Sequence, residues 1–185
     1  MDNKDLIRQI TIGDYKGEKI EFSGITHLKY EDCNEEFLIN IGEYRVHKAL
    51  GKAFLEMQNA AKKNNINLEI VSAFRSIEYQ KTIFPIKFKD KLNPTEEEFI
   101  ARLKFSAPAG FSEHHTGLAI DINSLEQDFA DTLEYEWLKN SAQIFGFEMS
   151  FPENNWQGLG FEPWHWRYVG DEICANIFKP ARLKK

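Results

Sequence analysis

The most informative stretch of this 185-residue chain reads Ser112-Glu113-His114-His115-Thr116-Gly117-Leu118-Ala119-Ile120-Asp121. Its second half predicts a strand, because apolar residues alternate with small or polar ones from Leu118 onward. The apolar residues of such a strand face the core, so Asp121 should project from the opposite face. The stretch therefore predicts a core strand that presents a carboxylate close to two histidines.

A second stretch, Glu162-Pro163-Trp164-His165-Trp166, alternates in the same way and continues to Tyr168. Its large rings share one face of a predicted strand, whereas His165 and Arg167 share the other. The two stretches contain three of the five histidines of the chain, which indicates that imidazoles are concentrated at one site.

Together these residues form the inventory of a catalytic zinc site. His114, Asp121 and His165 supply three ligands and leave a position for water. Glu162 is a candidate general base, since a bend at Pro163 can bring its carboxylate beside the water without binding the metal. The alternatives stay open at this point: three unrelated polar residues, because this spacing is common by chance, and a surface glutamate.

A candidate for substrate recognition lies earlier, in a predicted loop at Ser72-Ala73-Phe74-Arg75-Ser76. The guanidinium of Arg75 could bind a terminal carboxylate through two parallel hydrogen bonds, or it could stabilise an oxyanion. Arg167 competes for the same role, but its position on the strand of His165 favours a supporting one. A surface or structural arginine is the alternative for Arg75.

Composition limits the class of protein. Hydrophobic residues make up 42% of the chain and aromatic residues 14%, which is enough for one sizeable core. The net charge of −6 argues against nucleic-acid binding and against adhesion to an anionic membrane surface. The polar N-terminus has no apolar signal region and no stretch approaches membrane-spanning length, so we expect a cytoplasmic protein. Cys33 and Cys174 could form a disulfide or stay as two free thiols.

The remaining pattern predicts helices mixed with short strands. We expect strands and turns over 10–41, strands over 68–71 and 147–151, and helices over 43–63, from Ile77, from an Asn93 cap, over 128–145 ended by Gly146, and over 171–178. Because regular strand-helix-strand alternation is missing, we predict an α+β fold: a small, largely antiparallel sheet with helices packed on it and the zinc site at the sheet. We divide the chain into an N-terminal extension, 1–42, that packs on the core, and a catalytic domain, 43–185.

Taken in their order along the chain, the motifs at 72–76, 112–121 and 162–168 resemble the D-alanyl-D-alanine carboxypeptidase family of zinc peptidases. This family includes VanY-type, VanXY-type and L,D-carboxypeptidases. The resemblance covers about residues 43 to 170. It implies that His114, Asp121 and His165 bind one zinc ion, that Glu162 is the catalytic base, and that Arg75 stabilises the substrate carbonyl or carboxylate. It also implies that Gln80 and Ser112 contact the peptide and that His115 lines the pocket without binding the metal.

The function implied by this resemblance is hydrolysis of the terminal D-alanine of peptidoglycan stem peptides. Three alternatives remain: an L,D-carboxypeptidase, an endopeptidase that cuts within the stem peptide, and a non-catalytic zinc-containing binding module such as the related hedgehog signalling domain. A binding module would tolerate loss of the base, so the presence of Glu162 and Arg75 favours an enzyme. The sequence leaves the oligomeric state open.

Overall fold

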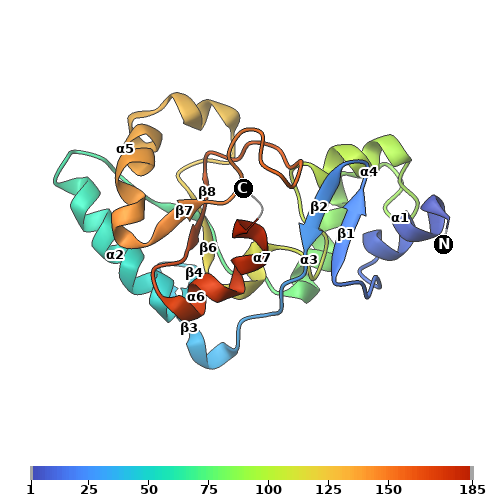
Figure 1. Cartoon of the computed structure of the whole chain (residues 1–185), viewed down its shortest axis with the longest axis horizontal. Coiled ribbons are helices and arrows are strands. Elements are labelled where there is room, and N and C mark those ends of the chain that lie inside the picture. Colours follow the sequence, from blue (N-terminus) through green and yellow to red (C-terminus); the bar gives the residue numbers. More distant parts are fainter. Residues whose placement is uncertain (1, 184–185) are drawn as a thin grey trace.

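A computed structural model describes residues 2–183 and is built around a four-stranded antiparallel sheet (Figure 1). The strand order is β5-β6-β8-β7, so β6 and β8 occupy the centre. The bounds are Ile70–Ser72 for β5, Ala119–Ile122 for β6, Phe147–Met149 for β7 and His165–Tyr168 for β8. The α+β class predicted from the sequence is confirmed. No helix among the described residues has the length and apolar character needed to span a membrane.

One face of this sheet carries the main core. Helices α2 (Lys48–Lys62) and α5 (Leu133–Ser141) lie on this side in Figure 1. Leu118, Ile120 and Ile122 are almost fully buried there, as the alternation predicted, and they join the core cluster that also contains Phe54 of α2. Asp121 consequently points to the other face of β6, and the site is built on that face.

A second, smaller core lies on the opposite side of the molecule, in the right half of Figure 1. It joins α1 (Asn3–Thr11), the hairpin β1 (Lys19–Phe22) and β2 (Ile25–Leu28), and α4 (Glu96–Leu103). The helix α1 was not predicted. Its N-terminus is capped by the Asp2 side chain, which accepts a hydrogen bond from the Asp5 N–H, and Ile7 and Ile10 anchor it in this core.

The predicted helix over 43–63 was wrong in its first turn. Residues 38–47 form a hairpin of β3 (Leu38–Ile41) and β4 (Tyr44–His47), which turns at Gly42 with a φ of 59°. Helix α2 begins only at Lys48, because the His47 side chain accepts a hydrogen bond from the Ala49 N–H and caps it. Val46 fits the apolar spacing of a helix, but a buried strand position satisfies the same apolar preference.

Further boundaries also differ from the prediction. Helix α4 is capped by Thr95, which exchanges hydrogen bonds with Glu98 in a capping box, so the predicted cap at Asn93 was wrong. The predicted helix over 128–145 is interrupted: α5 is flanked by 3-10 turns over 127–131 and 142–145, and the segment ends at Gly146 as predicted. Strand β5 begins two residues later than expected. The described fold is completed by α3 (Ile77–Ile83), α6 (Glu172–Ile177) and α7 (Lys179–Arg182). Both cysteines are free thiols.

Candidate metal centre

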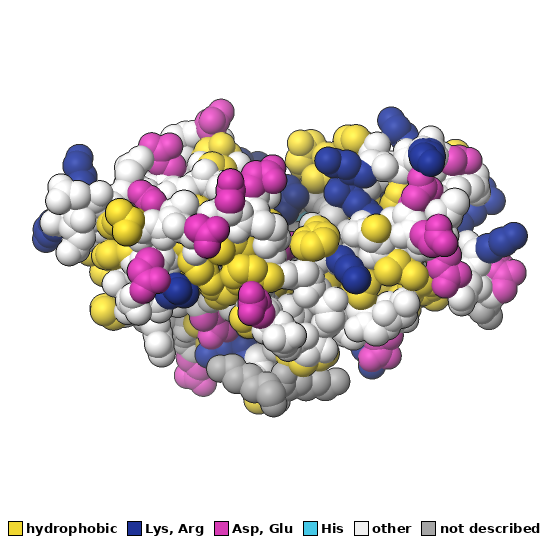
Figure 2. Space-filling model, turned by 90° about the horizontal axis from the view of Figure 1, so that it is seen from above, with side chains coloured by type: hydrophobic (Ala, Val, Ile, Leu, Met, Phe, Trp, Pro, Cys, Tyr) yellow, Lys and Arg dark blue, Asp and Glu magenta, His cyan; other side chains and the backbone are white. Residues whose placement is uncertain are grey.

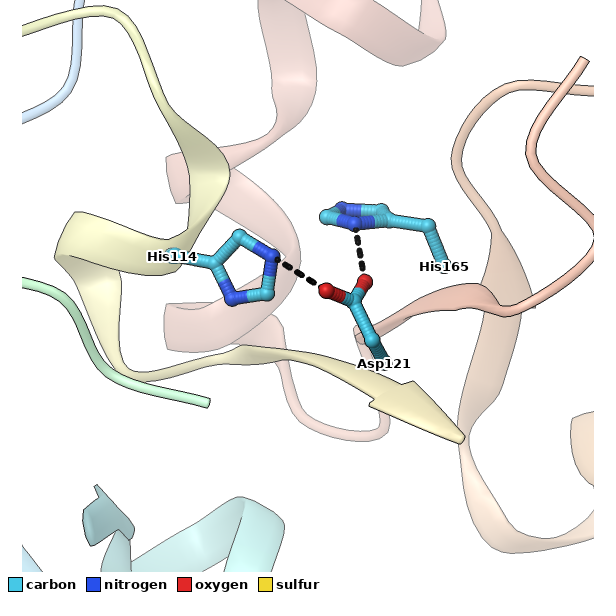
Figure 3. A group of neighbouring side chains, drawn as sticks. All are labelled: His114, Asp121 and His165. Carbon is cyan, nitrogen blue, oxygen red and sulfur yellow. Dashed lines mark hydrogen bonds and ion pairs between the residues drawn. The ribbon is translucent and has the colours of Figure 1, made fainter. Parts of the chain in front are cut away.

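Three predicted ligands converge on the sheet face opposite the main core (Figure 3). Ligand atoms of His114, Asp121 and His165 all lie within 4.8 Å of one another, and all three residues are buried. Asp121 Oδ1 lies 2.9 Å from His165 Nδ1, and Asp121 Oδ2 lies 3.3 Å from His114 Nε2. Because Asp121 on β6 is the register partner of His165 on β8, sheet pairing itself sets their proximity.

The third residue, His114, is placed by a 3-10 turn, Glu113–Thr116, that leads into β6. The Ser112 hydroxyl starts this turn by accepting a hydrogen bond from the His114 N–H at 3.3 Å. Gly117 ends the turn with a φ of 65°, where a Cβ atom would lie 3.0 Å from the backbone nitrogen of His47. The turn therefore requires glycine both for its left-handed backbone and for its close packing against β4.

The state of His114 fits a metal ligand. Both ring nitrogens are buried. Nδ1 has no hydrogen-bond partner among the described residues, and Nε2 faces the Asp121 carboxylate at 3.3 Å. Burial lowers the pKa of His114 to about 4, and the positive charge of Arg75 acts in the same direction. The ring is therefore neutral near pH 7, and a neutral imidazole has the lone pair that zinc binds. Two nitrogens and one carboxylate oxygen match the ligand set of a catalytic zinc site.

His165 is oriented by a residue that the sequence interpretation passed over, Glu113. His165 Nε2 lies 3.2 Å from Glu113 Oε2, so the Nε2–H can donate to this carboxylate while Nδ1 faces Asp121 and His114. Burial lowers the pKa of His165, but hydrogen bonds to Asp121 and Glu113 outweigh this and raise it to about 10. A metal at Nδ1 would replace the proton there, and the Glu113 contact would fix the ring orientation.

Glu113 is itself held as a carboxylate by a buried network. Arg167 Nη1 donates to Glu113 Oε1 at 2.7 Å, and Ser150 Oγ donates to Glu113 Oε2. Burial would raise the pKa of Glu113, but the charge of Arg167 and the bond from His165 lower it to about 2. A signal for this pair was present in the sequence, since a buried arginine on the strand face of His165 requires a nearby acidic partner.

Glu162 is the fourth functional group of the cavity, and its environment differs. Its Oε2 lies 3.8 Å from His165 Nδ1, and its side chain accepts no hydrogen bond from the described residues. Burial raises the pKa of Glu162 to about 8, and the neighbouring charge of Asp121 contributes in the same direction. A carboxyl group whose pKa lies close to neutrality can both take and return a proton, as a general base and acid must.

Arg75 enters the cavity from the loop after β5. The loop is tied to the turn of His114, because the Arg75 N–H donates to the His114 carbonyl at 3.4 Å. The Nε of Arg75 is buried without a hydrogen-bond partner in the described residues, and burial lowers the pKa of the guanidinium. Asp121 and Glu162 lie close enough to raise that pKa in opposition. An arginine with unused donors beside these carboxylates is available for a substrate oxygen.

The three other predicted substrate-binding residues are placed differently from one another. Ser112 lines the cavity. Gln80 is buried outside the cavity lining, and its side-chain amide donates to the Ala107 carbonyl at 2.7 Å. His115 also lies outside the lining: it accepts from the Gly110 N–H through Nε2 and donates from Nδ1 to the Arg75 carbonyl at 2.6 Å. His115 thus supports the Arg75 loop from behind.

The cavity that contains these groups has a volume of about 560 Å³. Its floor is the metal-ligand set, and its walls include residues of β2, the segment after α4 and the loop before β8. A larger hollow of about 1210 Å³ lies on the α2 and α5 side of the sheet and contains none of the ligand residues. The three ligand residues, Glu162 and Arg75 therefore line the smaller cavity, and none of them lines the larger hollow.

Comparison with known proteins identifies the family of the chain. The sequence model of VanY, D-alanyl-D-alanine carboxypeptidase, matches residues 43–171. The chain belongs to this family. A curated relative, the putative carboxypeptidase YodJ of Bacillus subtilis (strain 168), is 34% identical over 158 residues, which cover 81% of this chain and 56% of the relative. The chain spans 37% to 57% of the length of the curated relatives that it matches.

Solved structures of this family share the fold. The vancomycin resistance D,D-pentapeptidase VanY E175A mutant, in complex with Zn(II), superposes with a TM-score of 0.61 at 26% identity, covering 80% of this chain and 88% of that one. VanYB in complex with D-alanine-D-alanine superposes with a TM-score of 0.63 at 27% identity, and the match covers 80% of this chain and 84% of VanYB. The LD-carboxypeptidase LdcB superposes with a TM-score of 0.62 at 28% identity, and the match covers 91% of this chain and 76% of LdcB. Zinc in such a neighbour and the ligand set found here identify zinc as the metal that this centre fits.

Proposed function

We propose that this member of the VanY family is a zinc-dependent carboxypeptidase that removes the terminal D-alanine from peptidoglycan stem peptides. One observation carries the proposal: a three-residue ligand set, a buried glutamate with a raised pKa and an arginine with unused donors share one cavity. The neighbouring structure with D-alanine-D-alanine supports the substrate class. A binding module would need the ligand set alone, so Glu162 and Arg75 favour catalysis.

Zinc bound by His114, Asp121 and His165 supplies a Lewis acid, which lowers the pKa of water toward neutrality. The residues of the chain perform the proton transfers. Glu162 removes a proton from the attacking water and returns it to the departing D-alanine nitrogen. Arg75 donates hydrogen bonds to the carbonyl oxygen as negative charge develops on it. Glu113 and Arg167 take no part in proton transfer, because their ion pair is complete within the protein.

The test is hydrolysis of defined stem peptides by the zinc-loaded protein, followed by mass spectrometry. Loss of one alanine from the pentapeptide, abolished by a chelator and restored by added zinc, is the expected result. A Glu162→Gln variant that keeps its zinc serves as the matched control and should leave the pentapeptide intact. Equal turnover by this variant, or intact pentapeptide with the zinc-loaded protein, would refute the proposal.

The second candidate is an L,D-carboxypeptidase, favoured by the similarity to LdcB over 91% of this chain. The tetrapeptide, incubated in parallel, separates the two activities. Loss of alanine from the tetrapeptide but not from the pentapeptide would assign the L,D activity, and internal cleavage of the stem would assign an endopeptidase.

A further inference from the structure

One wall of the site cavity is lined by cations that have no anionic partner. Lys87, Arg102 and Lys104 line the cavity together with Arg75, and none of the four forms an ion pair with a described residue. The whole chain has a net charge of −6, so a cluster of unpaired positive charge beside the reaction centre is not a consequence of composition. Figure 2 shows Lys and Arg side chains beside the notch that borders the half containing β1, β2 and α4.

Arg102, on the last turn of α4, is fixed in its position. Its Nε donates to the Phe84 carbonyl at 3.0 Å and its Nη2 donates to the Ile83 carbonyl at 3.1 Å. The guanidinium also lies over the Phe84 ring, 5.7 Å from its centroid. Nη1 makes no hydrogen bond to a described residue. Nε and Nη2 therefore hold the guanidinium in place, while the N–H groups of Nη1 can donate to a ligand.

The backbone around this wall is held as firmly as the side chain. The buried His27 of β2 donates from Nε2 to the Leu103 carbonyl at 2.9 Å, and the Gly160 N–H donates to the Lys104 carbonyl at 2.8 Å. The Phe105 ring packs directly on Gly160, where a Cβ atom would lie 2.1 Å from it. Such preorganisation is what a binding subsite needs, since little conformational freedom is lost when a ligand binds.

The pKa of Arg102 is lowered mainly by its own burial and secondly by the positive charge of Arg75, so the two guanidinium groups interact. Two guanidinium groups that repel each other in a partly buried cavity are stabilised when an anion binds between or beside them. Arg75 already faces the carboxylates of Asp121 and Glu162, at the reaction centre. Arg102 lines the same cavity, but it forms no ion pair with a described carboxylate, and Arg75 is the charged group that shifts its pKa.

We propose that Arg102 is the main residue of a carboxylate subsite, with Lys87 and Lys104 at its rim, and that this subsite holds the free C-terminal carboxylate of the peptide substrate while Arg75 acts at the reacting carbonyl. The inference rests on the proposed function and adds how the terminus is recognised. Consecutive Cα atoms are about 3.8 Å apart, so the terminal carboxylate is the substrate anion closest to the reacting carbonyl. It therefore suits the second arginine of this cavity, Arg102, whereas an upstream carboxylate would lie several residues away.

The experiment compares two N-acetylated peptides that both end in D-alanyl-D-alanine, one with a free C-terminal acid and one with a C-terminal amide. For the zinc-loaded wild-type protein, kcat/KM should strongly favour the acid. In Arg102→Gln, kcat/KM for the acid should fall about 10- to 100-fold, mainly through KM, because one charge-assisted hydrogen bond is lost. The value for the amide should stay within about twofold, and Arg102→Lys should recover part of the preference for the acid.

A purely structural role of Arg102 gives a different result, because a disturbed α4 would lower kcat/KM for both peptides alike. Zinc content and thermal unfolding of Arg102→Gln identify a folding defect. If that variant does not fold, the double variant Lys87→Gln, Lys104→Gln takes its place, since both side chains are exposed. It should lower kcat/KM about two- to fivefold for the acid alone, and less at high ionic strength.

Two results would overturn the inference. One is equal cleavage of the acid and the amide by the wild-type protein, and the other is an equal loss of kcat/KM for both peptides in a folded Arg102→Gln. If the wild-type protein cleaves neither peptide, the proposed function fails instead. Calorimetric titration of the zinc-loaded protein with the same acid and amide then tests the subsite directly: tighter binding of the acid, weakened in Arg102→Gln, supports it, and equal binding refutes it.

Discussion

The two sides of the cavity treat buried charge in opposite ways. On the sheet side, Glu113 is paired with Arg167, and Asp121 contacts both histidines. On the α4 side, Arg102 and the two lysines at the rim have no ion pair with a described residue. Buried charges that form ion pairs fix the positions of the side chains around the metal site, whereas charges without an ion-pair partner can bind a charged ligand. The difference fits our proposal that the sheet side holds the metal and that the α4 side binds the terminal carboxylate of the substrate.

The same contrast appears between two glutamates on the sheet side. Glu113 and Glu162 are both buried near His165, but the pKa of Glu113 is lowered to about 2 and that of Glu162 is raised to about 8. Burial raises both values, and only Glu113 has an arginine and a serine bound to its oxygens. One carboxylate is therefore permanently charged and orients a ring, while the other is able to exchange a proton.

The largest effect is expected from removal of a metal ligand. His114→Ala should reduce bound zinc to background and abolish peptide hydrolysis, because two protein ligands do not hold a catalytic zinc site. The neighbouring His115→Gln should keep its zinc, since both hydrogen bonds of His115 are made to backbone groups and it is not part of the ligand set. Zinc content by mass spectrometry after gel filtration measures both. Loss of zinc from His115→Gln with retention in His114→Ala would reverse the assignment.

Removal of the proton carrier should have the next largest effect. Glu162→Gln should lower kcat about 10²- to 10⁴-fold, the range that general acid–base groups contribute, and leave zinc content unchanged. Asp121→Asn provides the contrast, because it should lose zinc together with activity. If Glu162→Gln lost its metal, Glu162 would be a ligand, and the distinction between the two glutamates would fail.

How much of this was accessible from the sequence depends on the range of the interactions involved. Period-two alternation in 118–122 and 164–168 predicted both central strands and the face on which Asp121 and His165 lie, because side-chain direction is fixed within a strand. The ligand set followed from these local patterns. Glu162 and Arg75 were candidates from their own surroundings in the sequence, the family resemblance implied their roles, and the structure places both in the cavity with the ligands.

The sequence could not predict what depends on distant contacts. Gln80 matches a peptide-contacting position of the family and His115 occupies a variable one. The structure shows both outside the cavity lining, bonded to the carbonyls of Ala107 and Arg75. Helix α1 is short and is stabilised by packing against a core formed largely by residues 84–111, which no local pattern specifies. Arg102 is an ordinary charged position on an amphipathic helix until the fold places it in the wall of the cavity.

A smaller effect is expected from the residue that orients His165. Glu113→Gln should weaken zinc affinity about 10- to 100-fold, because it removes the carboxylate that accepts from the ring and leaves Arg167 incompletely paired. Glu148→Gln is the matched control, since Glu148 Oε1 accepts a hydrogen bond from Arg167 Nε but does not contact His165. Competition with a chelating dye at pH 7 measures both affinities. Equal weakening in the two variants would mean that Arg167 pairing, and not ring orientation, matters for the metal.

The smallest effect concerns the α4 side and its dependence on pH. Burial lowers the pKa of His27 to about 4, although its bond to the Leu103 carbonyl opposes this. The folded state therefore keeps His27 neutral, whereas the unfolded chain takes up a proton below about pH 6.5. Because the unfolded state binds more protons in this window, the contribution of His27 to stability is complete above pH 6.5 and decreases as the pH falls toward 4.

Between pH 7 and pH 5.5 this loss should be about 1 kcal/mol, or about fivefold in the unfolding equilibrium. His27→Gln keeps a side-chain N–H for the Leu103 carbonyl but does not titrate, so its free energy of unfolding should fall less over the same interval. Urea unfolding of both proteins at the two pH values isolates the difference from all other titrating groups. Parallel profiles would show that His27 is accessible to protons in the folded state, and that the wall carrying Arg102 is less firmly anchored than its hydrogen bonds indicate.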